Sequence, residues 1–77
     1  MGTLSNISID DFRSYLLANG LECIRTTGGH EVWSKPGMTR PVILQTHIEP
    51  IPEFIVKNNL RSIGKTRKEF EEYLRKE

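Results

Sequence analysis

The 77-residue sequence predicts one α+β domain, in which a three-stranded antiparallel sheet carries helices on one face and leaves the other face free. Apolar residues recur at helical spacing near both ends of the chain, and short runs bounded by glycine and proline lie between them. The links between these runs are too short for crossover connections, so the strands must be antiparallel. The expected element order is α-β-β-β-α-α.

The first helix is expected over Ile9–Asn19. Ser8 is suited to be its N-cap, and Gly20 is well placed to end it in the left-handed conformation. The apolar stripe of this helix consists of Ile9, Phe12 and Leu16. Residues 1–7 are expected to form a loose N-terminal arm, so the domain spans residues 1–77 with that arm included.

The middle of the chain predicts a meander of strands at Leu21–Thr26, His30–Lys35 and Thr39–Thr46. The segment Thr27–Gly29 makes the first turn, and Pro36 with Gly37 makes the second. Pro41 cannot donate a hydrogen bond within a sheet, so the third strand must lie at an edge or turn that position toward solvent.

Two helices are expected after the sheet. Pro52 suits the first position of the earlier helix, and Gly64 ends it. Thr66 and Glu69 form a capping box that opens the later helix. The apolar stripes of these two helices consist of Val56, Leu60 and Ile63, supported by Phe54 and Ile55, and of Phe70, Tyr73 and Leu74.

The formal net charge of +1 lacks the strong basic excess of a dedicated nucleic-acid binder. Residues 23–48 are the most one-sidedly basic part, which fits either ordinary surface charge or a groove for a polyanion. The single Cys23 excludes an intramolecular disulfide and is interpreted as a small buried residue. No metal or cofactor is expected, because one cysteine and two histidines show no metal-site spacing. No membrane span or signal pattern is present, so a cytoplasmic protein is expected.

His30 directly follows Gly28 and Gly29, at the start of a predicted strand. Histidine exchanges protons near neutral pH, so this turn is either a site for proton transfer or a hairpin followed by a structural histidine. Strict alternation places His30 on the strand face of Val32, opposite Trp33. If Val32 faced the helices, His30 would need a bulge or the strand end to reach solvent.

These residues resemble the HicA (YcfA-like) family of toxins from bacterial toxin–antitoxin pairs, over about Ser8 to Leu74. The resemblance is carried by the motif from Gly28 to His30 with Trp33, by the segment from Pro41 to His47, and by Leu60, Gly64, Thr66, Glu69 and Phe70. The sequence departs from the family pattern at Gly29, where serine is commonest.

The resemblance implies a fold similar to double-stranded-RNA-binding domains, an mRNA-cleaving activity, and catalysis by the histidine in the position of His30. It also implies RNA and a HicB-type antitoxin as partners. Two alternatives remain: a non-catalytic RNA-binding domain and a protein-interaction module of the same fold.

Other residues are candidates for RNA contacts on chemical grounds. The amides of Gly28 and Gly29 can approach a phosphate, and Lys35 and Arg40 can bind phosphates through their charge. Trp33 can either stack on a base or belong to the core. His47 is interpreted as a surface turn residue, with a role as second proton donor as the alternative.

Overall fold

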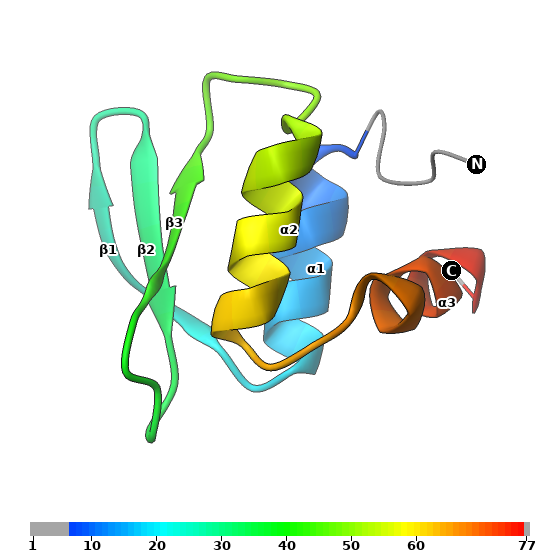
Figure 1. The fold of residues 1–77 in the computed structure, drawn as a ribbon. Coiled ribbons are helices and arrows are strands. Elements are labelled where there is room, and N and C mark those ends of the chain that lie inside the picture. The colour runs from blue at the N-terminus through cyan, green and yellow to red at the C-terminus, as the bar shows by residue number, and fades with distance from the viewer. Residues whose placement is uncertain (1–6, 77) are drawn as a thin grey trace.

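The computed structural model describes residues 7–76 and has the predicted α+β architecture (Figure 1). Its strands form one antiparallel sheet in the order β1-β2-β3, with β2 in the centre. The elements in chain order are α1 (Ile9–Ala18), β1 (Glu22–Thr27), β2 (His30–Ser34), β3 (Val42–Gln45), α2 (Glu53–Ser62) and α3 (Arg67–Lys76). The predicted order α-β-β-β-α-α is therefore confirmed.

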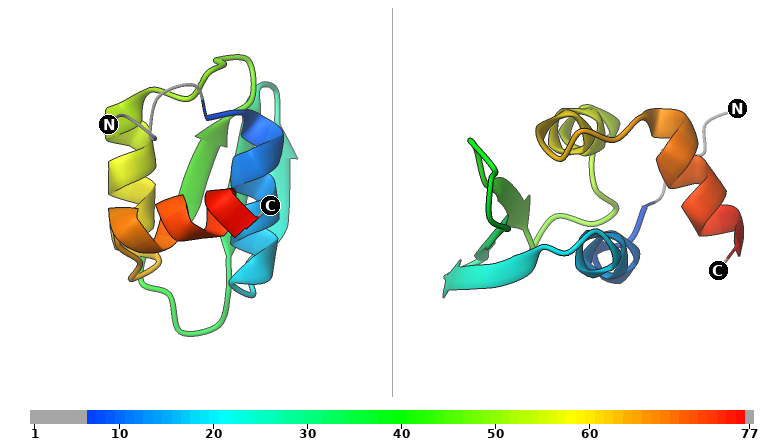
Figure 2. Two further views of the ribbon diagram at one scale, coloured as in Figure 1. Left: turned by 90° about the vertical axis from the view of Figure 1, so that its right-hand side faces the viewer. Right: turned by 90° about the horizontal axis from the view of Figure 1, so that it is seen from below.

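The helices lie on one side of the sheet in two layers. Helices α1 and α2 lie side by side against the sheet, and α3 crosses the outer side of this pair (Figure 2). Phe70 of α3 is fully buried there, with its ring centroid 5.5 Å from that of Phe12 and 4.7 Å from that of Tyr15. The opposite face of the sheet, which we call the open face, is left uncovered by the described residues.

The hydrophobic core lies between the sheet and the helices. Trp33 contributes the aromatic side chain of β2, and alternate residues of β3 point inward beside it. The largest fully buried side chains are Phe12, Phe70, Leu16, Leu21, Leu44, Leu60, Val42 and Val56. This inward set fixes the register of β2, because a shift of one residue would turn Trp33 to solvent.

The helix ends follow the local signals in the sequence. The Ser8 hydroxyl accepts a hydrogen bond from the Asp11 N–H at 3.0 Å, and Gly20 adopts a φ of +86° after α1. Thr66 and Glu69 form the reciprocal bonds of the predicted capping box. Pro52 is the N-cap of α2 and not its first helical residue, a difference of one position.

Strand β3 is shorter than predicted and begins just after Pro41. It does lie at an edge of the sheet, as the proline requires. The expectation of a loose arm is wrong at Ile7, which is 3% exposed and pairs with Ile51 through a bond from the Ile51 N–H to the Ile7 carbonyl. Residues 1–6, the rest of that arm, lie outside the described residues.

Cys23 is exposed, so its interpretation as a buried residue is wrong. Every residue of β1 is exposed, because this strand forms the edge of the sheet farther from α2 and lacks helix cover. The pairing with β2 is also irregular between Cys23 and Arg25, where Ile24 is an extra residue. A bulge of this kind is common at sheet edges.

Candidate functional site

His30 lies on the open face of the sheet, at the end of β2 that follows the Gly28–Gly29 turn. It pairs with Thr27 of β1 and with Gln45 of β3, and its side chain is exposed. Trp33 points toward the helices, so Val32 shares the open face with His30. His30 therefore reaches solvent by simple alternation along β2, and no bulge in that strand is needed.

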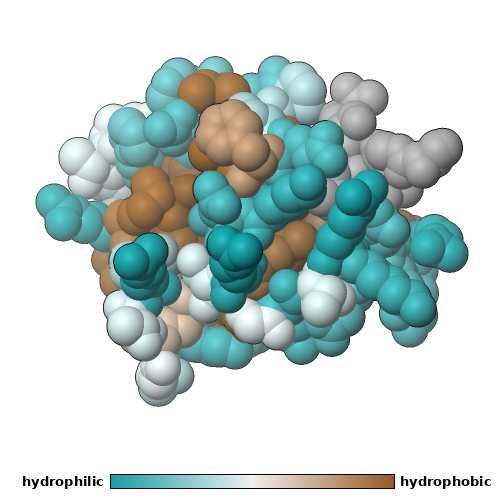
Figure 3. Space-filling view, in the orientation of Figure 1, coloured by the Kyte–Doolittle hydropathy of each residue, from teal (hydrophilic) through white to brown (hydrophobic). Residues whose placement is uncertain are grey.

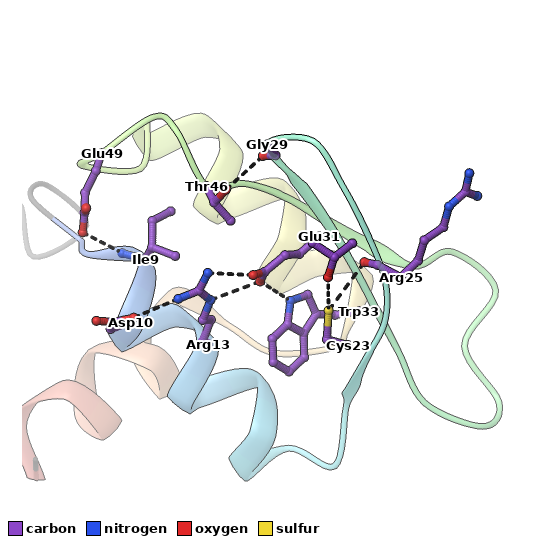
Figure 4. Close-up of polar contacts among 11 residues, drawn as sticks. Ile9, Asp10, Arg13, Cys23, Arg25, Gly29, Glu31, Trp33, Thr46 and Glu49 are labelled. Carbon is purple, nitrogen blue, oxygen red and sulfur yellow. Dashed lines mark hydrogen bonds and ion pairs between the residues drawn. The ribbon is translucent and has the colours of Figure 1, made fainter.

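Glu31 points the other way and anchors β2 to α1 (Figure 4). Its carboxylate accepts hydrogen bonds from the Arg13 guanidinium at 2.6 and 3.1 Å, and from the Trp33 indole N–H at 3.0 Å. The hydrogen bond from Arg13 is the main cause that lowers the pKa of Glu31 below its ordinary value of 4.5. The Glu31 carboxylate therefore lies on the helix-facing side of the sheet, on the opposite face from the His30 side chain.

The turn before His30 is tied to the segment that follows β3. Gly28 has a φ of +57°, a conformation that favours glycine. The Gly29 carbonyl accepts two hydrogen bonds from Thr46, from its N–H at 2.7 Å and from its hydroxyl at 3.2 Å (Figure 4). These bonds hold the exit of β3 against the β1–β2 turn.

His47 consequently lies beside His30, with 6.1 Å between the two ring centroids and an angle of 69° between the ring planes. Both side chains are exposed. A Cβ atom at position 29 would lie 2.6 Å from Nδ1 of His47, so this packing requires the absence of a side chain at Gly29. We refer to His30 and His47 as the histidine pair.

The proximity of His47 to His30 was not predicted from the sequence. The sequence did contain a signal for this proximity, because His30 begins one predicted strand and His47 directly follows the next predicted strand. Adjacent antiparallel strands place the start of one beside the end of the other. The sequence did not give the length of β3 or the turn at Thr46, and both determine how close the two rings lie.

The predicted basic residues Lys35 and Arg40 line one hollow at the end of β2 that is away from His30. Lys35 donates a hydrogen bond at 3.1 Å to the Asn19 carbonyl, and so interacts with the C-terminal end of α1. Arg40 lies in the β2–β3 loop and lines an open hollow with Arg61 of α2. The length of β2 separates both candidates from His30, a path of about 16 Å along the strand to Lys35.

Arg25 is a basic residue that the structure brings near His30, and the site prediction omitted it. It pairs with Val32 and lies on the open face, one cross-strand row away from His30. Such diagonal neighbours are roughly 7–8 Å apart. Figure 4 shows its side chain directed away from the helices.

Trp33 is 5% exposed and donates its indole N–H to Glu31. Its ring belongs to the core, so it has no free face on which a base could stack. Of the two interpretations of Trp33, the structure supports the core residue and contradicts the RNA contact.

An apolar groove of about 230 Å³ runs between β3 and α2, with Ile43, Ile51 and Ile55 among its lining residues (Figure 3). Within residues 7–76, no group of three or more histidine, cysteine, aspartate or glutamate side chains is placed to hold a metal ion. In the same range, no helix is both long and apolar enough to cross a membrane.

Comparison of the chain with models of protein families, with curated proteins and with solved structures finds no match.

Proposed function

We propose that this chain is a metal-independent endoribonuclease, the toxin of a toxin–antitoxin pair, with His30 as its acid–base residue. The observation that carries the proposal is the exposure of His30 on the open face, beside the Gly28–Gly29 turn and one row from Arg25. The resemblance of the motif from Gly28 to His30 to the HicA family supports the same function. Since its substrate is mRNA, we place its action in the cytoplasm.

RNA carries its own nucleophile, the 2′-hydroxyl beside each phosphate. Cleavage requires removal of the proton from this hydroxyl, stabilisation of the charge on the phosphate, and protonation of the 5′-oxygen that leaves. His30 acts on these protons, and proton transfer by a positioned side chain typically contributes about 10²–10⁴-fold. Arg25 and the amide of Gly29 are the groups beside it that suit the phosphate.

The partner in this proposal is a HicB-type antitoxin that covers the open face and thereby blocks access to His30. Ile24 and Ile43 are 62% and 43% exposed on the two edge strands. Ile43 pairs with Val32, and Ile24 lines a hollow with Glu22 and Ser34, so the open face carries an aliphatic row across its three strands. A partner that buries this row would shield the site at the same time.

The test is cleavage of RNA by the purified chain in the presence of a chelator. The wild-type chain is expected to cleave, and His30→Ala is expected to lose the activity by about 10²–10⁴-fold. Since His30 is exposed, the free energy of unfolding of this variant, obtained from its melting curve, should differ from that of the wild type by no more than about 0.5 kcal/mol. Lys68→Gln, an exposed change on α3, is the control for handling and purity.

The other outcomes identify the alternatives. RNA binding without cleavage by the wild-type chain indicates a non-catalytic RNA-binding domain. Absence of both binding and cleavage indicates a protein-interaction module. Cleavage that persists in a folded His30→Ala variant, at the wild-type rate, contradicts the assignment of His30.

A further inference from the structure

We infer that His47 is the second proton-transfer group of this site and protonates the leaving 5′-oxygen of RNA. The inference rests on the proposed ribonuclease function and assigns the two protons of that reaction to two different side chains. Its basis is the histidine pair, whose ring centroids lie 6.1 Å apart on an exposed surface.

The position of His47 is built into the fold. Thr46, its neighbour, gives both its N–H and its hydroxyl to the Gly29 carbonyl. The imidazole of His47 then packs where a side chain at Gly29 would stand, since a Cβ there would lie 2.6 Å from Nδ1. The turn that precedes His30 therefore also sets where His47 lies.

The chemistry needs two groups in opposite protonation states. His30 takes the proton of the 2′-hydroxyl as the 2′-oxygen forms its bond to phosphorus. The bond from phosphorus to the 5′-oxygen breaks, and that oxygen receives the proton of His47. The products are a 2′,3′-cyclic phosphate and a 5′-hydroxyl, and water returns the two histidines to their starting states. A single histidine would have to perform both transfers, whereas the pair divides them.

Three charged groups lie near the pair in the sheet or along the chain. Arg25 lies on the same face and favours the bound phosphate. Glu31 faces α1 and is held by Arg13. Glu49, two residues after His47, accepts a hydrogen bond from the Ile9 N–H at 3.0 Å.

The test compares ordinary RNA with an RNA in which sulfur replaces the 5′-oxygen at the cleaved bond. A thiolate leaves without protonation, because a thiol is far more acidic than an alcohol. His47→Ala should cleave ordinary RNA about 10²–10⁴-fold more slowly than the wild type and should cleave the sulfur substrate at close to the wild-type rate. His30→Ala should be impaired on both substrates.

Gly29→Ala is the second variant, and it keeps both imidazoles. The added methyl group displaces the His47 ring, and the φ of Gly29 is not among the positive values that would strain an alanine. We expect the same selective loss on ordinary RNA. This variant decides the question if His47→Ala does not fold.

Two results overturn the inference while the proposed function stands. One is wild-type cleavage of ordinary RNA by a folded His47→Ala variant. The other is an equal loss on both substrates, which makes His47 a residue that positions RNA and not a proton donor. If the wild-type chain cleaves neither substrate, the proposed ribonuclease function itself fails, and this inference fails with it.

Discussion

At the scale of single residues, the exposure of His30 depends on its neighbour Glu31. Successive side chains of a strand point to opposite faces, so the contacts of Glu31 with Arg13 and Trp33 turn His30 to the open face. The carboxylate is 13% exposed on the helix-facing side. A nearly buried charge is stable there because each of its oxygens has a hydrogen-bonding partner.

Replacement of Glu31 by alanine should destabilise the fold by about 1–3 kcal/mol, because the indole N–H of Trp33 and part of the Arg13 guanidinium lose their acceptor. Glu31→Gln keeps an acceptor for Trp33 and should cost less. The measurement is urea denaturation at pH 7, with Glu22→Gln on the exposed edge strand as the control. Equal stability of Glu31→Ala and the wild type would contradict the anchoring role.

The ion pair of Arg13 and Glu31 also predicts that the stability of the fold depends on pH. Arg13 lowers the pKa of Glu31 in the folded state, so the unfolded chain binds this proton more readily. The stabilisation is therefore complete above the ordinary value of 4.5 and is lost as the pH falls through the lower folded pKa. In Glu31→Gln this part of the acid sensitivity should disappear, as measured by denaturation between pH 7 and pH 3.

At the scale of elements, the features that depend on neighbours in sequence were predictable. The cap at Ser8, the left-handed Gly20 and the box of Thr66 with Glu69 each involve residues a few positions apart. The features that were missed arise from pairing between distant segments. Ile7 is buried because it pairs with Ile51, and Cys23 is exposed because no described helix covers the edge strand β1.

The open face of the sheet, taken as one element, predicts where the proposed antitoxin would bind. Ile24→Asp and Ile43→Asp should each weaken partner binding by about tenfold or more, because each places a charge in the aliphatic row that the partner must bury. Binding is measured by calorimetry with the co-purified partner. The RNA cleavage assay measures whether each variant escapes inhibition by that partner. Both residues are exposed, so the melting curves should change little.

Leu17→Asp is the matched control, since Leu17 is 60% exposed but lies on α1, on the other side of the sheet. It should leave partner binding unchanged. If Leu17→Asp weakens binding and the two isoleucine variants do not, the partner binds the helical side, and inhibition does not depend on cover of the open face.

At the scale of the whole molecule, the sequence drew attention to His30 and its glycine turn but did not predict which other side chains lie near them. His30 and the glycine turn were identified because a motif of neighbouring residues carries them. The segment-wise charge count marked residues 23–48 as basic but could not show that Arg25 joins the histidine pair while Lys35 and Arg40 lie beyond the other end of β2. The direction of each strand decides which of these basic residues lie near His30, and a count of charges along the sequence contains no information about strand direction.

The salt dependence of RNA binding should follow this layout. If the proposed function holds, a trinucleotide at the histidine pair is expected to contact Arg25 and not Arg40, because Arg25 pairs with Val32 within the sheet and Arg40 lies in the loop beyond the far end of β2. Each phosphate contact to single-stranded RNA contributes about 0.7 to the slope of log affinity against log salt. In a His30→Ala background, which prevents cleavage, Arg25→Gln should therefore reduce the slope by about 0.7. Arg40→Gln, which removes the same charge from the far end, should leave it unchanged. The reverse result would place the bound RNA over the hollow beside Arg61 and separate binding from the histidine pair.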